Sequence, residues 1–185
     1  MTSVKNATLR DILSRSSYRG AYECQSVPRD DLTLILRAGL SAPSGCNRQT
    51  TALIAVDDEA LLKDLKALID PPVAVTAPAF ICVLTLPIAA YADRYFYVQD
   101  YAAAIENMLV AIHALGYESC WYEGHITGSD DIAGRLAARL GVPGEYRLTC
   151  ILPVGRPAEA VKRVRKKPFA ARAWFNGFGK DPTQE

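Results

Sequence analysis

Apolar residues recur along the chain in two patterns, one typical of helices and the other of strands. Several stretches place them three and four residues apart, as the core-facing side of a helix requires. A first helix is expected to start at Thr8, and others to cover residues 28–41, 59–69, 99–115 and 130–140. Shorter apolar runs predict strands at residues 52–56, 79–86, 118–122 and 146–154. Because helices and strands alternate, the pattern indicates a mixed α and β protein.

The predicted helix at residues 99–115 is unusual because it is apolar on nearly every side. From Tyr101 it reads YAAAIENMLVAIHAL, with Glu106, Asn107 and His113 as the exceptions. A helix of this kind must be covered all round. Burial inside one monomer and burial in a dimer interface both meet that requirement.

The composition excludes several classes of protein. With 21 basic and 20 acidic residues, the net charge of +1 gives no global attraction for nucleic acid or an anionic membrane. No apolar run is long enough to cross a bilayer, and residues 1–19 lack the apolar core of a signal peptide. The five cysteines are widely spaced without a CxxC pair. This favours a reduced cytoplasmic protein over a disulfide scaffold or a zinc site.

The organisation of the chain is expected to be simple. Its 185 residues contain no internal repeat, low-complexity tract or flexible linker. We therefore expect one domain, residues 1–185, in which residues 160–185 form a polar, basic, extended C-terminal arm.

Two basic segments, one near each end of the chain, are candidates for binding an anion. Arg15, Ser17 and Arg19 alternate, so in extended backbone they project to one side and offer two guanidinium groups and a hydroxyl to a phosphate. Residues 162–167 read KRVRKK. On composition alone a solvated basic stretch is the ordinary explanation of each segment, and a nucleic-acid contact or one side of a phosphate site are further alternatives for the second.

Two loops offer further candidate binding groups. Residues 41–49 read SAPSGCNRQ, in which Pro and Gly favour a turn and several side chains are polar, directly before an apolar strand. Residues 120–124 run from an apolar stretch into Gly124, which would let the backbone approach a flat ligand closely. An ordinary helix-to-strand connection and an ordinary turn are the alternatives.

Taken together, in this order and spacing, the segments resemble the nitroreductase family. That family has an Arg-x-Ser-x-Arg/Lys pattern after its first helix and a Pro-Ser-x-x-Asn-x-Gln loop after its second. It continues with a long central helix, a strand running into a Gly, a Pro-Val-Gly strand end and a basic segment before a Pro. The matching positions here are Arg15, Ser17 and Arg19; Pro43, Ser44, Asn47 and Gln49; residues 99–115; Glu123 and Gly124; residues 153–155; and residues 162–168.

The resemblance implies an α+β fold of the nitroreductase type. Its central mixed β-sheet would have four or five strands flanked by helices, with the long central helix buried at the interface of a homodimer. It also implies one FMN per active site and two sites per dimer, each built from both subunits.

Specific residues take cofactor-binding roles from this resemblance. The set is Arg15, Ser16, Ser17, Arg19, Pro43, Ser44, Asn47, Gln49, Glu123, Gly124, Arg165, Lys166 and Lys167. Arg15, Ser17 and Arg19 would hold the phosphate, ribityl and ring-edge oxygens of FMN, and Arg165 with Lys166 or Lys167 would complete the phosphate site. The loop residues Pro43, Ser44 and Asn47 would reach the flavin from the partner chain. Glu123 and Gly124 would present backbone to the reactive N5 edge.

The implied reaction passes a hydride from NADH or NADPH through the flavin to a small quinone, nitroaromatic or enone acceptor, by ping-pong kinetics. Flavin carries the chemistry, so we expect no obligatory acid–base side chain and no metal ligand. The absence of a GxGxxG pattern leaves a separate Rossmann site for the nicotinamide unsupported.

Three stretches depart from the family pattern. Thr50 and Thr51 follow Gln49, where the family often has Pro and an aromatic residue. Residues 70–78 contain no Asn or Lys, which larger members place beside the flavin. Little sequence separates the strand at 79–86 from the central helix, where many members carry pocket-lining insertions. Residues 91–97 (YADRYFY) are the candidate for a substrate-side wall, with a packed aromatic surface as the alternative.

Other functions remain open at this point. An FMN enzyme of the same superfamily with another reaction, such as reductive dehalogenation, is one. A flavin-binding module for storage or redox sensing without efficient turnover is a second. A nucleic-acid binder that uses residues 162–167 is the third.

Overall fold

The fold is built around a small antiparallel sheet. Within residues 6–180, which the computed structural model describes, three strands form one sheet in the order β1-β2-β3. Their bounds are Thr51–Val56 for β1, Ala79–Thr85 for β2 and Arg147–Val154 for β3. Every residue of the central strand β2 is buried, as its continuous apolar run predicts. Its residue Ile81 lies opposite Ala55 of β1 and Leu152 of β3.

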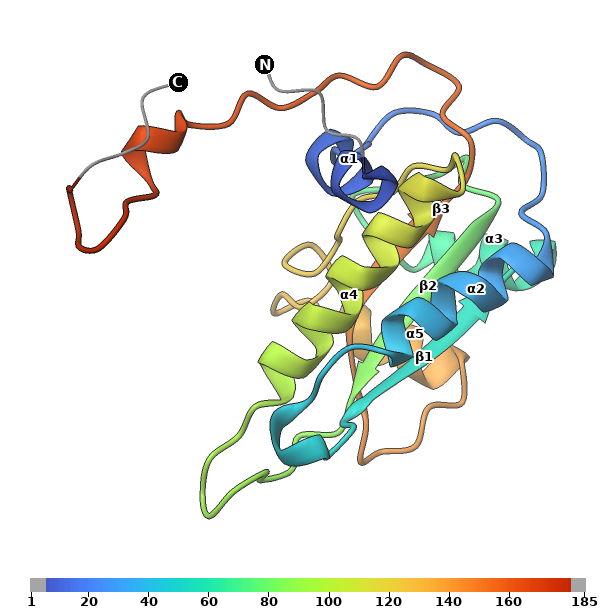
Figure 1. The fold of residues 1–185 in the computed structure, drawn as a ribbon. Coiled ribbons are helices and arrows are strands. Elements are labelled where there is room, and N and C mark those ends of the chain that lie inside the picture. The colour runs from blue at the N-terminus through green and yellow to red at the C-terminus, as the bar shows by residue number, and fades with distance from the viewer. Residues whose placement is uncertain (1–5, 181–185) are drawn as a thin grey trace.

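Helices cover both faces of this sheet (Figure 1). The helices are α1 (Ala7–Ser14), α2 (Arg29–Leu40), α3 (Glu59–Ala67), α4 (Tyr97–Ala114) and α5 (Ile132–Arg139). Short 3-10 turns, η1 at Gly45–Asn47 and η2 at Phe169–Ala171, lie in the connections. α2 and α4 pack on one face of the sheet, and α3 and α5 on the other. None of the described helices is long and apolar enough to cross a membrane.

The core has two halves because side chains of a strand point alternately to opposite faces. Phe80 and Cys82 of β2 pack with the α3 and α5 side, whereas Ile81 and Val83 pack with the α2 and α4 side. α2 and α4 approach closely at Gly39, where a Cβ atom would stand 2.7 Å from Cγ of Met108. α4 thus packs against both the sheet and the neighbouring α2, and these contacts fix its position.

The structure corrects several expectations from the sequence. The sheet within the described residues has three antiparallel strands, and not the mixed arrangement of four or five. Residues 118–122 form isolated bridges at Glu118–Gly155 and Tyr122–Ile151 in place of a continuous strand. α1 starts before Thr8 and is capped by the Asn6 side chain, which accepts from the amide of Leu9 at 3.1 Å.

After β3 the chain runs along the N-terminal segment and then away from the other elements. The amide of Ala158 donates to the carbonyl of Ala21, and Oγ of Ser16 donates to the carbonyl of Lys162 at 3.3 Å. Residues 163–180 are exposed or partly exposed, and Figure 1 shows them passing α1 and extending outward.

Candidate functional site

The segment after α1 is extended and alternates between buried and accessible side chains. Ser16 and Tyr18 are buried, and the amide of Tyr18 donates to the carbonyl of Ser119 at 2.8 Å. The residues that alternate with them, Arg15, Ser17 and Arg19, are partly or fully exposed on the other side of the backbone. The two guanidinium groups and the hydroxyl therefore project together, as the spacing predicts.

Arg15 carries the least satisfied polar group of this segment. Its Nε atom is buried and forms no hydrogen bond within the described residues, although Oε1 of Glu106 lies 3.3 Å away. Burial raises the pKa of the nearby Cys120 thiol, while the charge of Arg19, a hydrogen bond from Ser17 and the charge of Arg15 partly oppose this rise. The three candidate anion-binding side chains are thus close enough to the Cys120 thiol of the 118–124 segment to influence its pKa.

A chain of hydrogen bonds ties the same region to the C-terminal end of α4. Oγ of Ser14 lies 2.8 Å from Nε2 of His113, and Nδ1 of His113 lies 3.1 Å from Oε1 of Glu118. The three residues come from α1, α4 and the 118–124 segment. These hydrogen bonds fix the C-terminal end of α1, and with it the position of the adjacent Arg15.

The Glu123 carboxylate is held at both oxygens. The hydroxyl of Tyr101 donates to Oε1 at 2.7 Å and Nε1 of Trp121 donates to Oε2 at 2.7 Å. Burial and the bond to Glu123 raise the pKa of Tyr101 well above its usual value. Within residues 6–180 the amides of Glu123 and Gly124 donate no hydrogen bond, and nothing lies within 4 Å of a Cβ built on Gly124. This leaves an open strip of backbone with free donors.

The loop at residues 41–49 has a strained backbone that α4 holds in place. Cys46, Asn47 and Gln49 have φ angles of 51°, 54° and 51°, a region that non-glycine residues seldom adopt. Both oxygens of the buried Asp100 on α4 accept bonds of 2.7 Å, from the amide of Gly45 and the hydroxyl of Thr50. Such strain persists where the surroundings impose it, and it concentrates at ligand sites.

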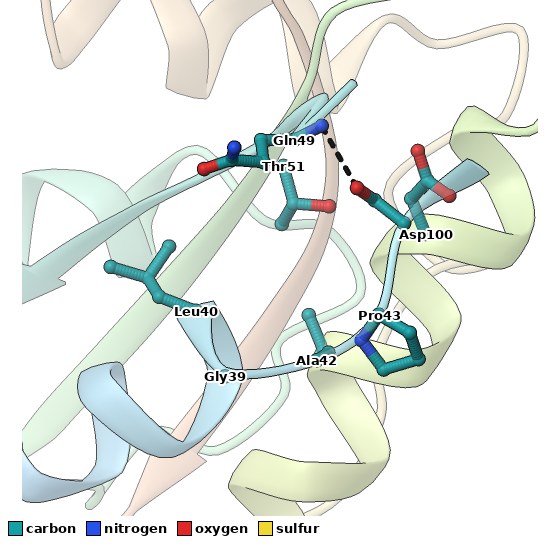
Figure 2. A pocket seen from close by; sticks show the side chains of 9 residues that line it. Gly39, Leu40, Ala42, Pro43, Gln49, Thr51 and Asp100 are labelled. Carbon is teal, nitrogen blue, oxygen red and sulfur yellow. Dashed lines mark hydrogen bonds between the residues drawn. The ribbon is translucent and has the colours of Figure 1, made fainter. Parts of the chain in front are cut away.

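A cavity of about 180 Å³ lies beside this loop, between the end of α2 and the start of α4. Figure 2 shows Pro43, Gln49 and Asp100 around it, with the bond of 3.0 Å from the amide of Gln49 to Oγ of Ser44. A shallower hollow of about 390 Å³ continues past Phe96 and Gln99. The loop therefore borders open space on the side of α4 that faces α2.

Within one chain these groups lie on two different flanks of α4. α1 and the 118–124 segment lie on one flank, and α2 with the 41–49 loop lies on the other (Figure 1). Their points of contact on α4 also differ, since Ser14 meets His113 while Gly45 meets Asp100. At 1.5 Å per residue these two helix positions are roughly 20 Å apart.

Comparison with known proteins identifies the chain. The model of the Nitroreductase family matches residues 12–75 and 66–156. The chain belongs to the nitroreductase family. A protein of Archaeoglobus fulgidus named "Putative NADH dehydrogenase/NAD(P)H nitroreductase" is 30% identical over 152 residues, which cover 82% of this chain and 86% of that protein.

Solved structures of nitroreductases share this architecture. A nitroreductase from Bacteroides fragilis with bound FMN is 28% identical, covers 91% of this chain and 98% of its own, and has a TM-score of 0.73. An FMN-dependent nitroreductase from Clostridium difficile is 24% identical, covers 92% and 99%, and has a TM-score of 0.76. The α+β class and the nitroreductase fold expected from the sequence are confirmed.

The cofactor residues expected from the nitroreductase resemblance fall into three places. Arg15, Ser16, Ser17 and Arg19 lie beside the segment that carries Glu123 and Gly124. Pro43, Ser44, Asn47 and Gln49 lie together on the other flank of α4. Arg165, Lys166 and Lys167 are exposed in the C-terminal segment, three to five residues beyond the Lys162 carbonyl that contacts Ser16. One chain therefore does not bring all three groups together.

Sequence reasoning missed the side chains that hold these nitroreductase segments in place. Asp100, Tyr101 and His113 all come from α4, where the sequence showed an apolar helix with few polar exceptions. Thr50, which departs from the family pattern, proves to be a partner of Asp100. The available signal was that Asp100 and Tyr101, at the start of an otherwise apolar helix, carry polar groups that need partners.

Proposed function

We propose that this nitroreductase-family chain is an FMN-dependent oxidoreductase that takes a hydride from NADH or NADPH and gives it to a small acceptor. The observation that carries the proposal is the buried Nε of Arg15, which has no hydrogen-bond partner within the described residues. Native proteins satisfy nearly all buried polar groups, so a cationic donor that is ion-paired with Glu106 at 3.3 Å but forms no hydrogen bond within the described residues points to a better-aligned acceptor supplied by a ligand. The phosphate of FMN is an acceptor that fits.

The phosphate end of the site is assigned to the segment after α1. A phosphate monoester carries roughly −1.5 to −2 charges at pH 7, so it favours two or more cations. Arg15 would supply one, beside the Ser17 hydroxyl, and Arg165, Lys166 and Lys167 would supply the others from the C-terminal segment. Guanidinium groups suit this role because they bind phosphate oxygens with two parallel hydrogen bonds.

The ring end is assigned to Glu123 and Gly124. The space beside Gly124 admits a flat group, and the free amides of these two residues are available to the reactive N5 edge. Bound FMN would supply the redox chemistry itself, by accepting a hydride at N5 and releasing it to an acceptor. The cation of Arg19 would lie at the pyrimidine edge and stabilise negative charge there. Donor and acceptor would use the same pocket in turn, which gives ping-pong kinetics.

A homodimer is part of the proposal because one chain separates the two halves of the site. Exposed apolar side chains gather on α1 and α2, on either side of α4, with Leu13 71% and Leu40 61% exposed. A second copy that covers them would bring its Pro43, Ser44 and Asn47 to the flank that carries Arg15. Each site would then contain groups from both subunits.

The cofactor and the dimer are tested on the purified protein. We expect a yellow protein with the absorption bands of oxidised flavin, FMN identified by mass spectrometry after release, and a particle mass of twice 20.2 kDa. A colourless monomer that fails to take up added FMN would overturn the proposal.

The reaction is tested by anaerobic stopped-flow mixing with NADH and with NADPH. Rapid bleaching of the flavin by at least one donor, and parallel double-reciprocal plots with a quinone, nitroaromatic or enone, are expected. Flavin that neither donor reduces would instead indicate a storage or sensing module. Faster turnover of an acceptor with a carbon–halogen bond would indicate a dehalogenating relative.

A further inference from the structure

The Glu123 side chain is fixed by two donors that the proposed function does not otherwise require. Tyr101, on α4, is only 5% exposed, and its hydroxyl bonds one carboxylate oxygen. Trp121 lies two residues before Glu123, on the same side of the backbone, and its indole N–H bonds the other oxygen. Since both bonds are 2.7 Å, the carboxylate cannot rotate without losing one of them.

The carbonyl of Glu123 is also fixed, from the following turn. It accepts from the amides of Ile126 and Thr127 at 2.9 and 3.1 Å and from the Thr127 hydroxyl at 3.0 Å. The carboxylate and the carbonyl are thus both anchored, while the amide has no partner within the described residues. Because the side chain and the carbonyl of Glu123 are both held by hydrogen bonds, the direction of its free amide N–H is determined as well.

We propose that Tyr101 and Trp121 are positioning residues that hold the Glu123–Gly124 backbone against the reactive edge of the flavin. The inference rests on the proposed function, because it assumes that these amides face FMN. The backbone requires such support here: the segment meets β3 through a bridge at Tyr122 and then leaves the sheet. Gly124, which is exposed with open space around it, would otherwise have wide conformational freedom.

The chemistry of the two donors predicts different outcomes for two changes at Glu123. A tyrosine hydroxyl can donate or accept, whereas an indole N–H can only donate. In Glu123→Gln the amide oxygen can therefore accept from Trp121 while the amide N–H donates to a reoriented Tyr101 hydroxyl. In Glu123→Ala both contacts are lost. If Glu123 acts by fixing the backbone, Glu123→Gln should recover most of the rate of flavin reduction that Glu123→Ala loses. If its negative charge is what matters, Glu123→Gln should not recover that rate.

The first experiment uses flavin-free protein, so that its readout does not depend on activity. Hydrogen–deuterium exchange of the peptide covering residues 119–127 is compared between wild type, Tyr101→Phe and Tyr117→Phe. Tyr117 is a matched control, since it is 5% exposed and its hydroxyl also donates to a carboxylate, Asp31, at 2.7 Å. Faster exchange in Tyr101→Phe alone supports the proposal, and equal exchange in all three overturns it.

The second experiment uses the FMN-loaded protein. In Tyr101→Phe, Trp121→Phe and Glu123→Ala we expect flavin reduction to slow roughly ten- to a hundredfold, because small misplacements at a reacting centre have effects of that order. The midpoint potential should shift while FMN affinity stays near that of Tyr117→Phe. Trp121→Phe is the independent variant if Tyr101→Phe does not fold.

The two proposals fail in different ways. Wild-type protein that does not bind FMN would end the proposed function. Wild-type protein that binds and reduces FMN, with unchanged reduction rate and potential in Tyr101→Phe and Trp121→Phe, would end the positioning role alone. Failure of Glu123→Gln to recover the rate lost in Glu123→Ala would also contradict positioning.

Discussion

Buried polar groups of this chain divide into those that are satisfied within it and those that are not. The buried Asp100 and the half-buried Glu123 each accept two hydrogen bonds of 2.7 Å. Nε of Arg15, although 3.3 Å from Oε1 of Glu106, and Oγ of Ser119 form no hydrogen bond within residues 6–180, and neither do the Oγ1 atoms of Thr51 and Thr85. Because the amide of Tyr18 joins the Arg15 segment to Ser119, the first two of these atoms belong to one region. A ligand bound there would supply what the fold leaves out.

Replacing Arg15 should remove FMN without unfolding the chain. Arg15→Ala deletes a charged hydrogen-bond donor, which is typically worth about 1.5–3 kcal/mol, so FMN should bind about ten- to a hundredfold more weakly. Isothermal titration with FMN measures this, and circular dichroism checks the fold. Arg10→Ala, on the exposed side of α1, is the control. Stoichiometric flavin retained by Arg15→Ala would contradict the placement of the phosphate.

The buried thiols predict how stability depends on alkaline pH. Burial raises the pKa of Cys82 from its usual 9.0 to about 12, and raises the pKa of Cys120 and Cys150 in the same direction. Between pH 9.0 and about 12 the folded chain holds more protons than the unfolded chain, so the free energy of unfolding falls as pH rises. The thiol contribution is intact below pH 9.0 and is lost between 9.0 and about 12.

Urea denaturation at pH 7 and pH 10 measures this effect. We expect a lower midpoint at pH 10, and a smaller drop in a Cys82→Ala variant, which lacks one of the titrating groups. Iodoacetamide at pH 8 should leave Cys82, Cys120 and Cys150 unlabelled until the protein unfolds. An unchanged midpoint, or fast labelling of Cys82 in the folded protein, would show that this thiol is not buried.

Among the elements, those that depend on local pattern were predicted well. α2, α3 and α4 and all three strands lie within a few residues of their predicted bounds, because apolar spacing alone determines which side faces the core. The 118–122 segment was predicted as a strand and forms only bridges to β3. Its backbone is shared between two partners, since the Ser119 carbonyl accepts from Tyr18 in the N-terminal segment. Sequence patterns do not reveal that competition.

The candidate site was predicted in part, for a similar reason. The alternation of Arg15, Ser17 and Arg19 is a property of local extended backbone and could be read directly. The contacts of Asp100 with Thr50 and of His113 with Ser14 join residues 50 and 99 positions apart. Such pairs depend on how α4 packs, which a single sequence does not specify.

The conformation of the 41–49 loop should depend on the two carboxylate oxygens of Asp100, which accept hydrogen bonds from Gly45 and Thr50. In Asp100→Asn one amide atom can accept from Gly45 while the other donates to the Thr50 hydroxyl, so little should change. Asp100→Ala leaves a buried amide and hydroxyl without partners, each costing about 1–3 kcal/mol. Urea denaturation should show this loss for alanine and a much smaller one for asparagine. Asp64→Ala, at an exposed ion pair with Arg139, is the control.

The strained loop residues sharpen this expectation. Cys46, Asn47 and Gln49 hold left-handed backbone against a cost of roughly 1–3 kcal/mol each. Without the Asp100 anchor they should relax, and exchange of the amides in residues 44–49 should accelerate. Equal stability of the alanine and asparagine variants would show that the anchor does not maintain the loop.

Over the whole molecule, the proposed function makes the two flanks of α4 complementary halves of one site. α1 and the 118–124 segment lie on one flank, and the 41–49 loop lies on the other (Figure 1). A twofold arrangement would place each half against the other half of the partner, so that every site uses one flank from each chain. The dimer would then be required for cofactor binding, and not merely for stability.

The exposed Cys46 offers a direct test of that arrangement, because it belongs to the loop assigned to the partner's flavin. In FMN-loaded protein, labelling of Cys46 by N-ethylmaleimide should be several-fold slower than in flavin-free protein. Cys24 is the internal control, since it is also exposed but lines a cavity of about 610 Å³ beside α3, away from α4.

Arg15→Ala extends the same test across the subunit boundary. Arg15 and Cys46 lie on different flanks of one chain, so loss of FMN in this variant can expose Cys46 only if the flavin bridges two subunits. We expect Cys46 of Arg15→Ala to label at the flavin-free rate, with Cys24 unchanged. Protection of Cys46 that does not depend on FMN, or that persists in Arg15→Ala without flavin, would mean that the loop does not contact the cofactor of a partner.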